Sequence, residues 1–175
     1  YYKVFKNNTK MKKNVLFLLS LLTIIISLSS CGGIDPVKYN DNLVSYSDIA
    51  GDRIMGLNDK IDGIEDLENY TDSIKVLGEN TIDSLKSDLN KISLMEPAKG
   101  SEDFKAATIA YMESLISYTK TLTEEYSKVS EETSDEDYNN IDKLIDESFD
   151  TSMKKLEAMQ AAQKSFAKAN NFILK

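Results

Sequence analysis

The sequence predicts an all-α protein, an antiparallel up-down four-helix bundle, and three observations predict it. Apolar residues recur at spacings of three and four over most of residues 36–175, as on the buried face of a helix. The same region holds only two prolines, Pro36 and Pro97, and no alternating apolar pattern of useful length for a strand. Four apolar stripes with short connections favour neighbouring helices that run in alternating directions.

The first two helices are defined by prolines and by breaks in the stripe. Asp35 is the expected N-cap of the first helix, because the following Pro36 suits the first helical turn. The first stripe is expected to break within residues 58–63. The second stripe begins at Leu67 and is expected to end near Met95, since the residues before Pro97 avoid helical geometry.

The last two helices each follow a serine. Ser101 is the predicted N-cap of the third helix, whose heptad pattern continues to Val129. The fourth helix is expected to start after Ser134, with Asp137 completing a capping box. The apolar tail within residues 170–175 is expected to close one end of the bundle.

Charge and residue usage exclude several kinds of function. Residues 1–30 carry five lysines and no acidic residue, so residues 31–175 carry 16 basic and 29 acidic groups, a net charge of −13. A nucleic-acid partner is therefore not expected, and an anionic membrane should repel this body. The chain has no histidine and a single cysteine, which removes the commonest general base, an intramolecular disulfide and a thiolate zinc site. We expect no enzyme, no catalytic residue, no metal and no cofactor.

One acidic stretch has the spacing of a calcium-binding loop. Asp135, Asp137, Asn139 and Asp146 fall at positions 1, 3, 5 and 12 of an EF-hand. Position 6 requires glycine for its turn, but Asn140 stands there, and the helical stripe continues through the segment. The residues are better interpreted as the acidic, capped start of the fourth helix.

The beginning of the chain has the three parts of a secretory signal. Residues 11–30 combine a short basic stretch, an apolar run over residues 15–28 and small residues at the end. A bilayer-spanning helix needs roughly 20 apolar residues, so this run of 14 predicts a cleaved signal peptide. Residues 1–10 add nothing to such a signal, and we interpret them as an upstream extension before a translation start at Met11.

The residues Leu28-Ser29-Ser30-Cys31 resemble the lipobox of bacterial lipoproteins. The resemblance implies cleavage between Ser30 and Cys31, a diacylglycerol on the Cys31 thiol, and acylation of the new amino group, for example by palmitate. Each buried methylene contributes about 0.8 kcal/mol, so two or more chains hold a protein stably at a membrane. Residues 31–35 would then be a lipidated tether and residues 36–175 the bundle, with the membrane as a partner through Cys31.

Three segments resemble a family of small uncharacterised bacterial surface lipoproteins with a helical body: residues 38–44, 135–139 and 166–172. The resemblance implies a cell-envelope protein and brings no catalytic residue with it. Gly33, in place of aspartate at the second position after Cys31, is similar to lipoproteins sorted to the outer membrane. We expect a non-catalytic binding or structural module on either face of that membrane. The alternative is a small-ligand or cation-binding bundle with a pocket between helices.

Overall fold

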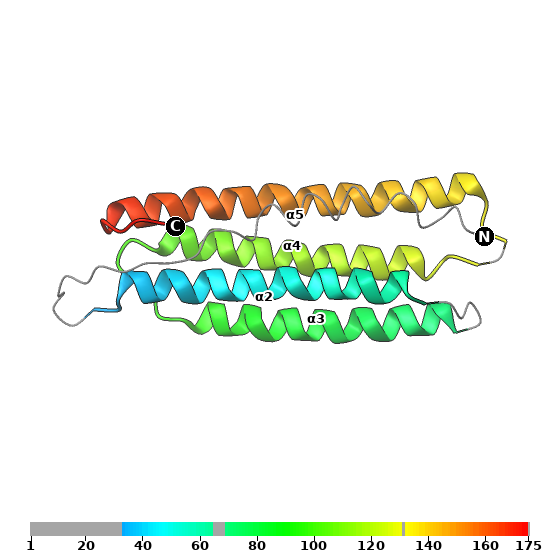
Figure 1. The fold of residues 1–175 in the computed structure, drawn as a ribbon, viewed down its shortest axis with the longest axis horizontal. Coiled ribbons are helices and arrows are strands. Elements are labelled where there is room, and N and C mark those ends of the chain that lie inside the picture. The colour runs from blue at the N-terminus through cyan, green and yellow to red at the C-terminus, as the bar shows by residue number, and fades with distance from the viewer. Residues whose placement is uncertain (1–32, 65–68, 131, 175) are drawn as a thin grey trace.

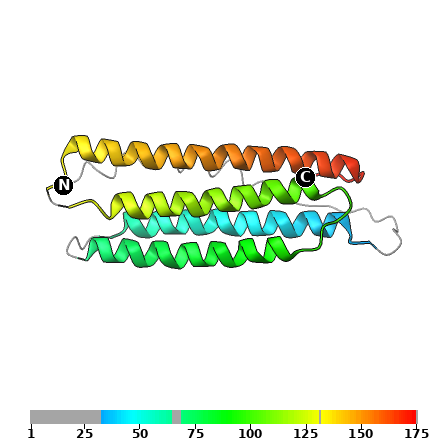
Figure 2. The ribbon, with the colours of Figure 1, turned by 180° about the vertical axis from the view of Figure 1, so that it is seen from behind.

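The computed structural model describes residues 33–64, 69–130 and 132–174, which form four helices and no strand (Figure 1). The helices are α2 (Pro36–Asp62), α3 (Tyr70–Leu94), α4 (Glu102–Tyr126) and α5 (Asp135–Ala169). Successive helices lie side by side and run in opposite directions, as Figures 1 and 2 show from two sides. The predicted all-α four-helix bundle is confirmed. The predicted upstream extension, signal peptide and Cys31 lie outside the described residues.

The bundle has two ends that differ in which helix termini meet there (Figure 1). We call the end at which α2 and α4 begin and α3 and α5 finish the entry end, because the described chain enters the bundle there at Gly33. We call the opposite end the far end. The most extensive contacts in the bundle are those of α4 with α5 and with α3. The contacts of α2 with α5 are fewer than those of α2 with α3 or α4.

The first two helices begin and end close to the predicted positions. The Asp35 side chain accepts a hydrogen bond from the Val37 backbone N–H at 2.9 Å, so the predicted N-cap is confirmed. The helix ends at Asp62, inside the predicted break. The second helix begins at Tyr70; the Leu67 start predicted from the stripe lies outside the described residues. It ends at Leu94, three residues before Pro97.

The third helix begins where predicted, after Ser101, but ends earlier than predicted. Ser101 occupies the N-cap position, but its side chain makes no capping hydrogen bond, because its backbone (φ −95°, ψ 1°) lacks the extended conformation of a capping residue. Its Oγ is buried without a hydrogen-bond partner among the described residues. The preceding Gly100 takes a φ of 75°, which favours glycine. The helix ends at Tyr126 and does not continue to Val129. Val129 nevertheless packs against the core from the following turn, and this packing explains why its position fits the apolar stripe.

The start of α5 has the predicted cap in a modified form. The Ser134 Oγ accepts from the Asp137 backbone N–H at 3.1 Å and donates to the Asp137 carboxylate at 2.6 Å. In a full capping box the carboxylate would accept from the Ser134 backbone N–H instead. The segment that matched EF-hand spacing is helical from Asp135 onward, which is not the geometry of a calcium-binding loop.

The core fills the space between the four helices with one continuous cluster. An aromatic group closes its entry end: the Phe166 ring lies 6.0 Å from that of Tyr39, 5.8 Å from Phe104 and 5.7 Å from Phe172. The last of these contacts forms because Asn171, with a φ of 55°, turns the tail back toward the bundle. The predicted closure by the tail therefore holds for Phe172, whereas Ile173 is 80% exposed.

Candidate functional site

The predicted cleavage and lipid-attachment residues, Ser30 and Cys31, come just before the described residues in the sequence. Because consecutive Cα atoms are 3.8 Å apart, the Cα of Cys31 lies within about 8 Å of that of Gly33. Gly33 is exposed and comes three residues before Pro36, where α2 begins at the entry end. A lipid on Cys31 would therefore be held beside the entry end. No helix among the described residues is long and apolar enough to cross a bilayer.

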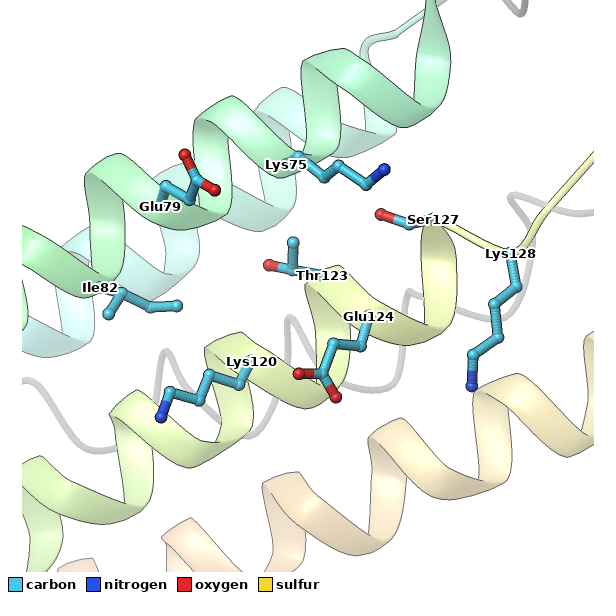
Figure 3. A pocket seen from close by; sticks show the side chains of 8 residues that line it. All are labelled: Lys75, Glu79, Ile82, Lys120, Thr123, Glu124, Ser127 and Lys128. Carbon is cyan, nitrogen blue, oxygen red and sulfur yellow. The ribbon is translucent and has the colours of Figure 1, made fainter.

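An open groove of about 600 Å³ lies on the surface between α3 and α4 (Figure 3). It forms beside Gly78, where the two helices approach so closely that a Cβ on this residue would lie 2.0 Å from the Thr123 Oγ1. Three lysines, two glutamates and three smaller side chains line it: Lys75, Glu79, Ile82, Lys120, Thr123, Glu124, Ser127 and Lys128. Its volume is in the range of small-molecule pockets.

The charges around this groove do not converge on one point. Figure 3 shows the side chains of Lys75, Lys120 and Lys128 extending in different directions, with their ammonium groups well separated. Lys128 is paired with the Glu125 carboxylate at 2.6 Å. The Ser127 Oγ is buried without a hydrogen-bond partner among the described residues. A ligand here would meet dispersed charges of both signs, so the groove offers no concentrated charge that could select one.

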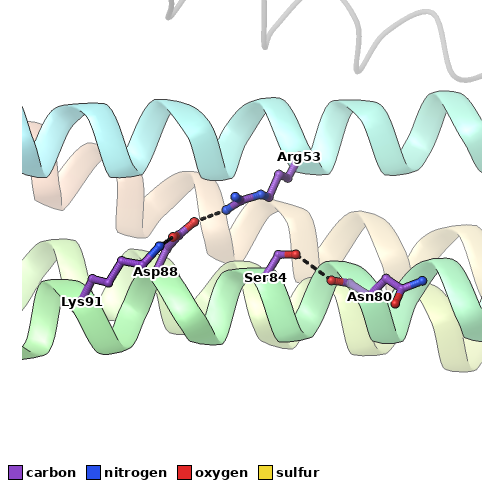
Figure 4. Close-up of polar contacts among 5 residues, drawn as sticks. All are labelled: Arg53, Asn80, Ser84, Asp88 and Lys91. Atoms are coloured by element: carbon purple, nitrogen blue, oxygen red, sulfur yellow. Dashed lines mark hydrogen bonds and ion pairs between the residues drawn. The ribbon is translucent and has the colours of Figure 1, made fainter.

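A buried carboxylate joins α2 to α3 (Figure 4). Asp88, with 4% of its side chain exposed, accepts from the Arg53 guanidinium and, at 2.8 Å, from the Lys91 ammonium. Burial alone would raise the pKa of Asp88, but the hydrogen bonds and charges of Lys91 and Arg53 outweigh burial and hold that pKa below its ordinary value. The carboxylate is thus ionised and fully engaged, which suits a structural link between helices and not a general base.

Tyrosine hydroxyls in the core are also unsuited to proton transfer. Burial raises the pKa of Tyr111 and that of Tyr118 to about 12, so both hydroxyls stay protonated at neutral pH. The Tyr118 hydroxyl lies 3.3 Å from the Asn58 Oδ1, to which it donates. Within the described ranges, no three cysteine or acidic side chains are placed to hold a metal ion.

One pair of buried hydroxyls was not foreseen from the sequence. The Tyr39 and Ser101 hydroxyls are buried at the entry end, and neither makes a hydrogen bond of normal geometry among the described residues. Burial raises the pKa of Tyr39, the neighbouring Ser101 hydroxyl lowers it in part, and the Glu102 charge raises it. Nothing in the stripe pattern distinguishes these hydroxyls from other core positions, because the pattern reports burial and not hydrogen bonding.

The chain matches no protein-family model, no curated protein and no solved structure. The resemblance to small surface lipoproteins thus stays a prediction from three short segments.

Proposed function

We propose that this chain is a lipid-anchored protein of the bacterial cell envelope whose helical bundle is a non-catalytic binding or structural module. The observation that carries the proposal is the apolar run over residues 15–28 followed by Leu28-Ser29-Ser30-Cys31, with the single cysteine of the chain at its end. Diacylglycerol on Cys31 and an acylated amino group would supply enough buried methylenes for stable attachment. Gly33 supports sorting to the outer membrane.

The described polar groups support a role without catalysis. Asp88 is occupied by two cations, and the buried tyrosine hydroxyls remain protonated at neutral pH. With no histidine in the chain, a general base would have to come from other carboxylates or lysines. The groove between α3 and α4 favours the small-ligand alternative only weakly, because its charges are dispersed.

The direct test compares the wild-type chain with Cys31→Ser in bacteria fed labelled palmitate. We expect label in the wild-type protein, its partition into the detergent phase, and loss of both in Cys31→Ser. Ser30→Lys, which places a large charged residue before the cleavage point, should leave an uncleaved precursor. Equal labelling and partition of wild type and Cys31→Ser would overturn the proposal.

The same cells can show which face of the membrane displays the bundle. Protease added to intact cells should remove a C-terminal tag if the bundle is outside, and should spare it until lysis if the bundle faces the periplasm. Surface display would direct the search for partners to host or neighbouring-cell ligands, and protection would direct it to envelope machinery.

A further inference from the structure

The negative charge of the bundle is concentrated in one half of its length. We define the entry half as residues 33–48, 82–114 and 153–174, and the far half as the other described residues. The entry half has nine basic and ten acidic residues, a net charge of −1, whereas the far half has six basic and fifteen acidic residues, a net charge of −9. The repulsion expected between this acidic protein and an anionic membrane is therefore confined largely to one half.

Charged and apolar side chains are both displayed around the entry end. The second half of α5 contains four lysines against the single acidic residue Glu157, and Lys99 adds an exposed ammonium from the loop before α4. Four exposed carboxylates also lie at this end: Asp35, Glu96, Glu102 and Asp103. Leu94 at the end of α3 is 77% exposed, and Ile173 in the tail is 80% exposed. Ile34, just before α2, is 38% exposed. These three are half of the large hydrophobic side chains that are exposed among the described residues, and all belong to segments at this end.

The described chain begins at Gly33, at this same end. One residue separates Cys31 from Gly33, so the tether gives the bundle little freedom to turn its far end toward the lipid. The 35 residues of α5 make the bundle about 50 Å long at 1.5 Å per residue. With a tether of about 8 Å at the entry end, the far end cannot face the membrane while the entry end points away from it.

We propose that the entry end is a membrane-contact surface that rests on an anionic phospholipid bilayer; this inference rests on the proposed lipid at Cys31. Exposed Leu94 and Ile173 enter the headgroup region, while Lys99 and Lys168 lie near lipid phosphates. Apolar burial and the attraction of each lysine to anionic lipid act together there, and the acidic far half points away from the surface. The orientation thus follows from charge, exposed apolar area and tether length at once.

Lysine acetylation of the lipidated, full-length protein tests this orientation. The protein is reconstituted in vesicles of phosphatidylcholine and phosphatidylglycerol, neither of which has an amine that can be acetylated, and is treated briefly with an acetylating reagent. Compared with the same protein in neutral detergent, Lys99 and Lys168 should react several-fold more slowly. The exposed far-half residues Lys60 and Lys143 should react at unchanged rates and are internal controls. Equal reaction of the two sets would overturn the proposal.

Matched variants show whether the exposed apolar residues hold the entry end at the membrane. Leu94→Ser with Ile173→Ser should abolish the protection of Lys99 and Lys168. Val76→Ser with Leu144→Ser, which removes exposed apolar side chains from the far half, should leave it intact. All four positions are exposed, and helical circular dichroism checks the fold. Protection of Lys99 and Lys168 that persists in the first variant would contradict the proposal. Protection in detergent that grows with protein concentration would also contradict it, because it would indicate a second copy of the chain on this surface.

Acetylation is measured by mass spectrometry of the peptides, which also gives the mass of the peptide that carries Cys31. This mass separates failure of the orientation from failure of the proposed function. An unmodified Cys31 would refute the lipid anchor itself. The orientation can still be tested there by coupling a maleimide phospholipid to Cys31, the single thiol of the chain. Protection of Lys99 and Lys168 in the coupled protein would support the membrane-contact surface, and its absence would refute it.

Discussion

The two halves of the bundle share one helical architecture but are stabilised in different ways. In the entry half, Phe166 contacts three aromatic rings, and the net charge is −1. In the far half, Tyr118 contacts one ring, that of Phe149, and the net charge is −9. A repeated apolar stripe thus specifies helix packing while leaving aromatic packing and charge free to vary along the length.

The largest effect should come from truncating the aromatic group of the entry half. Phe166→Ala removes a 2% exposed ring and should lower the free energy of unfolding by about 3–5 kcal/mol. The far-half variant for comparison is Phe149→Ala, whose ring centroid is 5.6 Å from that of Tyr118. It should lower the free energy of unfolding clearly less, because Phe149 is only partly buried. Urea denaturation of both variants measures the difference, and equal losses would show that the halves do not differ in packing.

A second comparison tests the close approach of α3 and α4 in the far half. Gly78→Ala places a Cβ against Thr123 and should cost about 1–3 kcal/mol, even though alanine favours a helix. Gly51→Ala, at a helical position with no atom within 4 Å of the added Cβ, should instead stabilise the protein by up to about 1 kcal/mol. Thermal denaturation gives both signs. If Gly78→Ala also stabilised the protein, the proposed helix contact would be wrong.

The stability that Asp88 contributes between α2 and α3 should depend on pH as expected for a carboxylate whose pKa is lowered in the folded state. Asp88→Asn removes a charge that accepts from Arg53 and Lys91, and we expect a loss of about 1 kcal/mol at neutral pH. Because the pKa of Asp88 is lowered in the folded state, this stabilisation is present above the ordinary carboxyl pKa. It disappears as the pH falls through the lowered pKa. Urea midpoints of both proteins across acidic pH should therefore converge; a constant difference would contradict the assignment.

The smallest effect, with the opposite pH dependence, is expected in the far half. Burial and the neighbouring Asp146 charge raise the pKa of Asp142, against a hydrogen bond from Tyr126 that lowers it. Ionised Asp142 therefore disfavours the folded state above that pKa, and Asp142→Asn should stabilise the protein at neutral pH by less than about 1 kcal/mol. The gain should shrink as the pH falls through the raised pKa. A destabilised variant at neutral pH would show that the charge is favourable where it stands.

The sequence was sufficient for the helices but not for all of their ends. Asp35 and Ser134 were identified because the side chain of an N-cap is a local property of the chain. Ser101 is the N-cap by position, as the same rule predicts, but its backbone conformation does not direct its side chain to the helix N–H groups. The heptad pattern extends to Val129 because this residue packs on the core, although the helix ends before it. Periodicity alone does not distinguish a helical residue from a packed turn residue.

The polar contacts between helices could not be predicted in the same way. Asp88 lies on a helix rich in charged residues, and its burial depends on Arg53, 35 residues earlier in the chain. The groove beside Gly78 likewise depends on how α3 meets α4, which one stripe does not define. The difference in net charge between the two halves depends on the antiparallel topology, which places separate segments of the chain in the same half.

The central claim is that a lipid on Cys31 holds the entry end at a membrane. Mass spectrometry of the N-terminal peptide, from protein extracted from bacterial membranes, tests it most directly. We expect a chain that begins at Cys31, with diacylglycerol on the Sγ. A membrane-derived chain that retains residues before Cys31 and has a free thiol there would contradict it.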